Sequence, residues 1–300
     1  MAKGRYKGLY PMLYSFFAAD GGLDRDAMKA QVDACVAAGV SGIAILGIVG
    51  EFNKMSMSER RRVVEVVGEV LERRLPLAVT ICEPSIEGQI EFMRVAEAAH
   101  ADWVILQPPP VKGIAEAELV RFFGAVAEKA KLPVAIQNNP VNLDVWLSDN
   151  GLKTLNRNHA NVCLLKGEGP VHVVRRTIEA TEGAYDVFSG LGGKELPMSL
   201  RAGCIGCVPA PDCVDVQARI IRLMESGQED EAEALHRSIL PLLYFVLHSP
   251  EHMLCYGKRL FARRAGIRSV HPRAPFIAPT EFSTGVIEAY AKGLPPLPQG

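Results

Sequence analysis

Short apolar segments alternate with amphipathic segments along most of the chain. From residue 40 onward the alternation repeats about every 20 to 30 residues, which is typical of successive βα units. Eight of the apolar segments lack the polar alternation of a half-exposed strand, so we expect both of their faces to be covered. They are Gly8–Tyr14, Gly42–Leu46, Leu77–Cys82, Trp103–Leu106, Val134–Gln137, Val162–Lys166, Asp186–Ser189 and Cys204–Val208. The pattern therefore predicts eight parallel strands.

The segments between these strands carry the end signals of helices. Asp24 stands before one apolar stripe and Gly39 stands after it, and these residue types begin and end helices. Ser56 and Glu59 have the spacing of a capping box, in which each side chain binds the backbone N–H of the other residue. We therefore expect helices between the strands.

Eight βα units within the first 210 residues favour a closed (β/α)₈ barrel, the TIM barrel. An open doubly wound sheet usually carries a glycine fingerprint after its first strand, and this chain has none there. The remaining segments have helical periodicity, near Asp212–Glu225, Glu229–Leu247, His252–Ala265 and Glu281–Ala291. We therefore expect a barrel in residues 1–210, which carries the functional site, and a C-terminal helical region in residues 211–300.

Charge, cysteine content and the apolar runs indicate what kind of partner and which cell compartment to expect. The 33 basic and 34 acidic residues nearly cancel, which argues against nucleic acid or an anionic membrane as the main partner. The seven cysteines are odd in number and lie mostly in apolar runs, which is typical of reduced core thiols. The N-terminal segment has no signal-peptide pattern, and no apolar run approaches the roughly 18 residues that a membrane span needs. We expect a cytoplasmic protein whose partner is a small molecule.

Two motifs suggest other chemistry, and both have a simpler interpretation. Cys204-x-x-Cys207, followed by Cys213, resembles part of a zinc site but falls in an expected buried strand and lacks a second pair, so we expect core packing and no metal. The segment Gly190–Lys194 is rich in glycine, but its spacing is not that of a phosphate-binding loop. We interpret it as a tight turn into a helix.

Reactive side chains of such barrels come from the C-terminal ends of the strands. The segments expected there are Gly47–Glu51, Gln107–Pro110, Gln137–Pro140, Lys166–Glu168 and Ser189–Gly190. Lys166 directly follows four apolar residues, and a desolvated amine supplies the neutral nucleophile that imine formation with a ketone needs. From position alone, two structural alternatives stay open: the Lys166 side chain extends to the rim of the barrel, or it pairs with Glu168.

Motifs spread over nearly the whole chain resemble those of the dihydrodipicolinate synthase and N-acetylneuraminate lyase superfamily. They comprise an opening G-x-x-P-x-x-x-x-F with a following D-G-x-x-D, a G-x-x-G-E loop, an S-x-x-E helix start and an N-x-P motif. The residues that carry the resemblance are Gly8, Pro11, Phe16, Asp20, Gly21, Asp24, Gly47, Gly50, Glu51, Ser56, Glu59, Asn138, Pro140, Lys166, Ser189, Gly190 and the turn 202–206. The resemblance implies a barrel lyase.

The same resemblance implies how the site works. It makes Lys166 the residue that forms an imine with a small 2-keto acid, without cofactor or metal, in a homo-oligomer that is a dimer or a tetramer. The substrate-binding residues that it implies are Gly47, Ile48, Val49, Gly50, Asn138, Ser189 and Gly190. Ser189 has a second interpretation, because a serine that closes a strand is often a local cap.

Four positions that bear on the reaction depart from the superfamily pattern. Ile48 and Val49 occupy the places of hydroxyl-bearing residues, so only backbone N–H groups remain there to hold a carboxylate. Gln137 replaces the tyrosine that relays protons, and a glutamine is neither an acid nor a base. Asn142 stands where the synthases carry an arginine that grips the carboxylate of the second substrate. These departures argue against a synthase.

Gln137 within I-Q-x-x-P, together with Lys166 and Glu168 in K-x-E, resembles the L-2-keto-3-deoxyarabonate dehydratase branch. This resemblance implies dehydration of a 2-keto-3-deoxy sugar acid. Glu168 is then the expected acid and base, and Gln137 orients the substrate or a water. A purely structural pairing of Glu168 stays open.

Two further functions stay open at this point. One is a pyruvate-dependent aldolase or a condensing enzyme similar to dihydrodipicolinate synthase. The other is a catalytically weakened homologue that acts as a binding protein. The presence of Lys166 argues against the second of these.

Overall fold

Eight parallel strands form one sheet in the computed structural model, which describes residues 4–298. The sheet order is β1-β8-β7-β6-β5-β4-β3-β2, and a parallel bridge between Met12 and Ala44 joins its two edges. The strands are β1 Gly8–Leu9, β2 Ile43–Ile45, β3 Leu77–Ile81, β4 Trp103–Leu106, β5 Val134–Asn138, β6 Val162–Gly167, β7 Asp186–Ser189 and β8 Gly206–Cys207. The closed sheet confirms the predicted (β/α)₈ barrel.

The first and last strands are shorter than the predicted Gly8–Tyr14 and Cys204–Val208. Gly8 and Gly206 pair so closely that a Cβ on Gly206 would lie 2.0 Å from the carbonyl oxygen of Gly8. The regular strand ends at Leu9, yet the backbone N–H groups of Tyr10 and Met12 still donate to the carbonyls of Cys207 and Pro209 at 2.9 and 2.7 Å. The segment also stays buried. Apolar patterning therefore marked burial correctly and overestimated the length of the regular strands.

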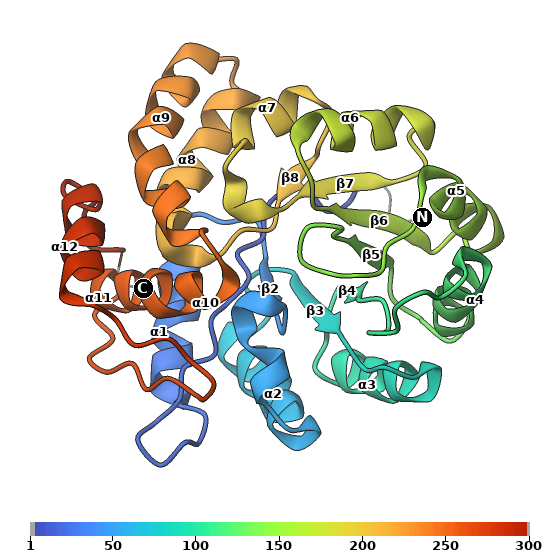
Figure 1. Ribbon diagram of the computed structural model, residues 1–300, viewed down its shortest axis with the longest axis horizontal. Helices are drawn as coiled ribbons and strands as arrows, with labels where there is room; N and C mark the ends of the chain where they lie inside the picture. The colour runs from blue at the N-terminus through green and yellow to red at the C-terminus, as the bar shows by residue number, and fades with distance from the viewer. Residues whose placement is uncertain (1–3, 299–300) are drawn as a thin grey trace.

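One helix follows each strand and covers the outside of the barrel (Figure 1). These helices are α1 Arg25–Ala37, α2 Met57–Leu71, α3 Ile86–Ala98, α4 Glu116–Ala127, α5 Asp149–Asn158, α6 Val171–Ala180, α7 Leu196–Arg201 and α8 Val214–Glu225. The side chain of Asp24 caps α1, and Ser56 and Glu59 form the predicted capping box of α2. The helix-start signals of the sequence are thus confirmed.

The C-terminal part of the chain is helical, as predicted. It contains α9 Glu229–Val246, α10 Pro250–His252, a π-helical turn Met253–Gly257, α11 Lys258–Arg264 and α12 Glu281–Tyr290. These helices gather at one side of the barrel, beside α8 (Figure 1). Since α8 packs against both β1 and α9, it links the barrel to this helical part, and the division at residue 210 stays a prediction. No helix among residues 4–298 combines the length and the apolar character that crossing a bilayer requires.

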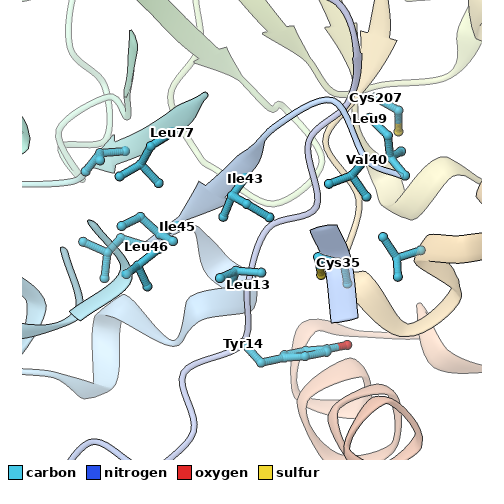
Figure 2. Packing of buried hydrophobic residues seen from close by; sticks show 14 of the residues in the cluster. Leu9, Leu13, Tyr14, Cys35, Val40, Ile43, Ile45, Leu46, Leu77 and Cys207 are labelled. Carbon is cyan, nitrogen blue, oxygen red and sulfur yellow. The ribbon is translucent and has the colours of Figure 1, made fainter. Parts of the chain in front are cut away.

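Two apolar clusters hold the barrel together. The larger one fills the layer between strands and helices, and Figure 2 shows part of it, with Leu13, Ile43 and Cys35 between β2 and α1. The smaller one fills the barrel interior, where the rings of Trp103 and Phe188 stack with their centroids 5.3 Å apart. Because the interior is packed, any site must lie at the mouth of the barrel.

The cysteines belong to these buried layers. All seven lie within the described residues, and no disulfide joins any two of them. Burial raises the pKa of the Cys204 and Cys207 thiols to about 12. No cluster of His, Cys, Asp and Glu in residues 4–298 has an arrangement that could hold a metal ion.

Candidate active site

Lys166 lies at the C-terminal end of β6, between Gln137 of β5 and Phe188 of β7 in the strand register. Only 6% of its surface is exposed, because it points into the barrel above the aromatic interior. It lines a cavity of about 330 Å³ at the mouth of the barrel. The cavity is large enough for a small organic acid.

Glu168 also lines this cavity and lies next to Lys166. Its Oε2 atom is 3.3 Å from the Lys166 Nζ atom, so the two side chains form a buried ion pair. The same oxygen accepts a hydrogen bond of 2.6 Å from Gln137 Nε2 and one of 2.8 Å from Asn139 Nδ2. Three donors thus surround Oε2, whereas no donor among the described residues contacts Oε1. This leaves Oε1 available to accept a proton.

Gly190 gives Glu168 the room it needs. A Cβ at position 190 would lie 2.3 Å from the Glu168 Cγ atom and 2.5 Å from Oε1. Such distances are far below van der Waals contact, so a larger residue would displace the carboxylate. Gly190, which the sequence predicted to be in the site, therefore borders the Glu168 carboxylate.

Asn139 is the residue that sequence reasoning missed. It is fully buried, and its Oδ1 atom accepts a hydrogen bond of 2.9 Å from the backbone N–H of Asn142, which orients its Nδ2 toward Glu168. The predicted Asn138 lies one residue earlier and bonds in both directions to the backbone of Leu147, at 2.8 and 3.0 Å. In this structure Asn138 braces the loop that follows β5.

The loop after β2 forms the opposite wall. Ile48 and Val49 line the cavity at the start of a short 3₁₀ helix, Ile48–Gly50. No acceptor in the described part of the chain takes up their backbone N–H groups. Amides free in this way at a helix start can bind a carboxylate without help from side chains. The geometry thus offers a place for the acid group of a substrate, despite the two apolar side chains.

A buried ion cluster holds this loop in place. Glu51 has a left-handed backbone with φ of 57° and is 2% exposed. Its Oε1 atom accepts a hydrogen bond of 2.6 Å from Lys258 of α11, and Lys54 lies 3.5 Å from its Oε2 atom. Burial lowers the pKa of the Lys258 ammonium below its ordinary value, although Glu51 opposes this shift. The C-terminal helices therefore fix the conformation of the loop after β2.

The remaining predicted residues lie close by but make local contacts. Gly47 donates its N–H to the sulfur of Met12 at 3.1 Å, and the carbonyl of Gly50 accepts a hydrogen bond of 2.7 Å from Ser15. Ser189 donates its hydroxyl to the carbonyl of Gly206 at 3.3 Å, which fits a local cap. Substrate contacts of these three residues stay predictions.

Residues late in the chain form the last wall of the cavity. Lys194 lines it, together with Leu247 and His248, which follow α9. Lys194 donates a hydrogen bond of 3.3 Å to the carbonyl of Leu247, and burial lowers the pKa of its ammonium. A lysine at a helix C-terminus complements the partial negative charge there. The segment Gly190–Lys194 turns into α7, as predicted, and shapes this wall.

Comparisons with known proteins agree with this arrangement. A model of the dihydrodipicolinate synthetase family matches residues 5–285. The chain is 28% identical over 242 residues to the putative 2-dehydro-3-deoxy-D-gluconate aldolase YagE of Escherichia coli, covering 79% of this chain and 80% of that protein. It is 25% identical over 300 residues to the 4-hydroxy-tetrahydrodipicolinate synthase of Methanopyrus kandleri, covering 98% of each.

A solved structure shares the fold. The crystal structure of YagE from Escherichia coli K12 in complex with pyruvate has a TM-score of 0.87 and 24% identity, covering 96% of this chain and 98% of that chain. Aldolases and synthases of this family are lyases, and this chain is an enzyme of that class. The dehydratase branch stays a prediction, because these relatives are named as an aldolase and a synthase. Since the family model spans most of its length, this chain belongs to the dihydrodipicolinate synthetase family.

Proposed function

We propose that this protein is a lyase that binds a small 2-keto acid as an imine on Lys166 and dehydrates it with Glu168 as acid and base. The substrate class is a 2-keto-3-deoxy sugar acid, with L-2-keto-3-deoxyarabonate as the reference compound. One observation carries the proposal: Lys166 and Glu168 line one cavity, 3.3 Å apart, and no donor among residues 4–298 contacts the second oxygen of Glu168. The proposal also includes a cytoplasmic location and a homo-oligomeric state of the protein.

The first step is formation of the imine. Glu168 takes a proton from Lys166, the neutral amine attacks C2 of the keto acid, and one water leaves as the C=N bond forms. The backbone N–H groups of Ile48 and Val49 hold the substrate carboxylate during this step. The imine acts as the electron sink, so the reaction uses no cofactor and no metal.

The second step is loss of the C4 hydroxyl. The Oε1 atom of Glu168 removes a proton from C3, and the electron pair forms an enamine between C2 and C3. The enamine expels the C4 hydroxyl, which leaves as water with the proton that Glu168 now carries. Tautomerisation gives a semialdehyde, and one water hydrolyses the imine and returns Lys166. One water is lost overall; C4 is reduced and C5 is oxidised to the aldehyde to the same extent, so the reaction needs no external oxidant or reductant.

Gln137 supports this sequence without exchanging protons. Its Nε2 atom holds Oε2 of Glu168 at 2.6 Å, where a tyrosine would offer a titratable hydroxyl. Aldol cleavage requires a base that takes the proton of the C4 hydroxyl, and the hydroxyl residues suited to that task are absent at positions 48, 49 and 137. This difference favours dehydration.

Aldol cleavage is the second candidate, because YagE is named as a putative aldolase. The product distinguishes the two reactions. With L-2-keto-3-deoxyarabonate we expect a dehydrated semialdehyde, identified by mass spectrometry. Release of pyruvate and glycolaldehyde, detected with lactate dehydrogenase, would replace the dehydratase with an aldolase.

The role of Glu168 is tested by Glu168→Gln, which keeps the shape of the side chain and removes its basicity. We expect turnover to fall by about 10² to 10⁴, the usual contribution of general acid–base catalysis. The matched control is Glu128→Gln, at an exposed position after α4. Equal turnover of Glu168→Gln and wild type would refute the assigned role.

A further inference from the structure

A buried row of three glutamines leads from the outer helix layer to Glu168. Gln89 of α3, Gln107 at the end of β4 and Gln137 of β5 are each at most 3% exposed. Gln89 donates through its Nε2 atom to the backbone carbonyl of Gln107 at 2.9 Å and to that of Glu83 at 3.0 Å. Gln107 donates through its Nε2 atom to Gln137 Oε1 at 2.8 Å. Gln137 then donates to Glu168.

The direction of this row follows from the charge at its end. A carboxylate oxygen accepts hydrogen bonds, so the end of Gln137 that faces Glu168 at 2.6 Å has to be its NH₂ group. The opposite end is then the carbonyl oxygen, and a neighbouring group has to donate to it. Gln107 is the donor that the structure provides at this place. An acceptor at position 107 would favour the reversed amide, which turns the Gln137 oxygen toward Glu168.

Burial makes this orientation costly to lose. A buried carbonyl without a donor loses the hydrogen bond that water would otherwise supply, and hydrogen bonds to charged groups are among the strongest in proteins. Gln107 does not line the cavity of Lys166 and Glu168, so it does not meet the substrate directly. Any effect of Gln107 on the reaction must therefore act through Gln137.

We propose that Gln107 is a positioning residue, which locks the side-chain amide of Gln137 so that its NH₂ group stays on Glu168 and keeps that carboxylate available as the base. This inference rests on the proposed function, because it assigns Glu168 a proton transfer. Asn139 is locked in the same way by the backbone N–H of Asn142, a donor that no side-chain substitution removes. The orientation of Gln137 thus depends on a side-chain donor that a substitution can remove, whereas the orientation of Asn139 is held by a backbone donor.

The test is a double-mutant cycle with Gln107→Met and Gln137→Met. Methionine matches the length of glutamine and offers no strong donor. We expect Gln107→Met to lower kcat by about tenfold, the usual size of one lost hydrogen bond to a charged group, with little change in KM. We also expect the acidic limb of the pH–rate profile to move to higher pH, because Glu168 accepts a proton more easily after losing an amide donor.

The decisive comparison is Gln107→Met in the Gln137→Met background. If Gln107 acts through Gln137, the second substitution has no further effect on kcat or on the pH profile. Additive losses, or a wild-type pH profile in Gln107→Met, would overturn the inference. Gln228→Met, at an exposed position before α9, is the surface control, and urea unfolding of each variant separates catalytic loss from instability.

Failure of the proposed function and failure of the role of Gln107 give different experimental results. If borohydride does not trap a 2-keto acid on the wild-type enzyme, the proposed function fails. If trapping and dehydration occur normally and Gln107→Met matches the wild type in kcat and in its pH profile, only the role of Gln107 fails.

Discussion

Gly190→Ala adds one methyl group directly against the Glu168 side chain. The new Cβ would lie 2.3 Å from Cγ and 2.5 Å from Oε1 of Glu168. Carbon atoms in contact are about 3.5 to 4.0 Å apart, so Glu168 has to retreat by on the order of 1 Å. The φ of Gly190 is −125°, outside the left-handed region that favours glycine, so the contact with Glu168 is the effect that the structure predicts.

A retreat of this size breaks the arrangement around Oε2. The hydrogen bonds of 2.6 and 2.8 Å from Gln137 and Asn139 lengthen, and the carboxylate moves relative to the substrate. A displacement of about 1 Å in an active site can cost roughly 10²-fold in rate. We therefore expect kcat for dehydration to fall by about 10²-fold, while borohydride still traps an imine on Lys166, more slowly because Glu168 takes the Lys166 proton in that step.

The matched control is Gly285→Ala. No described residue comes within 4 Å of a Cβ at this position, which is exposed in the middle of α12. Replacing a helical glycine with alanine stabilises a helix by about 1 kcal/mol, so this variant should be fully active and slightly more stable. Wild-type kcat in Gly190→Ala would refute the view that the exact position of Glu168 matters. Loss of activity in both variants would refute the contact as the cause.

Three further outcomes follow from the same structure. Asn139→Leu removes one donor from Glu168, and we expect kcat to fall by about tenfold in steady-state assays with the fold retained; an unchanged kcat would contradict the role of Asn139. Hydrogen bonds from Arg273 and from Ser56 lower the pKa of Glu59 to about 2 from the ordinary 4.5. A lowered pKa means that this pair stabilises the fold above about pH 4.5 and that the contribution disappears as the pH falls toward 2. Hydrogen exchange near residue 273 should therefore rise in that range, modestly because 41% of the Glu59 side chain is exposed, and Arg273→Ala should remove the dependence. Prolonged treatment with a chelator should leave dehydration unchanged, and loss of activity that added metal restores would contradict the imine as sole electron sink.

Much of the fold was predictable because burial dictates residue type. Strands covered on both faces have to be apolar throughout, so the eight segments stood out, and Lys166 stood out as the charged residue that ends one of them. The end of β1 was less predictable, since the regular strand stops at Leu9 while burial and hydrogen bonds from Tyr10 and Met12 continue beyond it. Hydrophobic patterning reports where a side chain lies and not where a regular strand ends.

The amide contacts of the site could not be predicted from the sequence, for a different reason. Asn138 and Asn139 have the same side chain, and the path of the loop after β5 decides which one turns toward Glu168. The pairing of Lys166 with Glu168 was one of the alternatives left open, and the structure shows that it coexists with access to the cavity. The role of Gln107 depends on a partner 30 residues away, which no local motif reveals.

Every proposed step depends on an imine between Lys166 and a 2-keto acid. Incubation with pyruvate and borohydride, followed by intact-mass measurement and peptide mapping, tests it most directly. We predict one reduced adduct per chain, located on Lys166, and none in Lys166→Ala. An adduct that persists in Lys166→Ala, or a wild-type chain that stays unmodified with pyruvate and with L-2-keto-3-deoxyarabonate alike, would contradict the account.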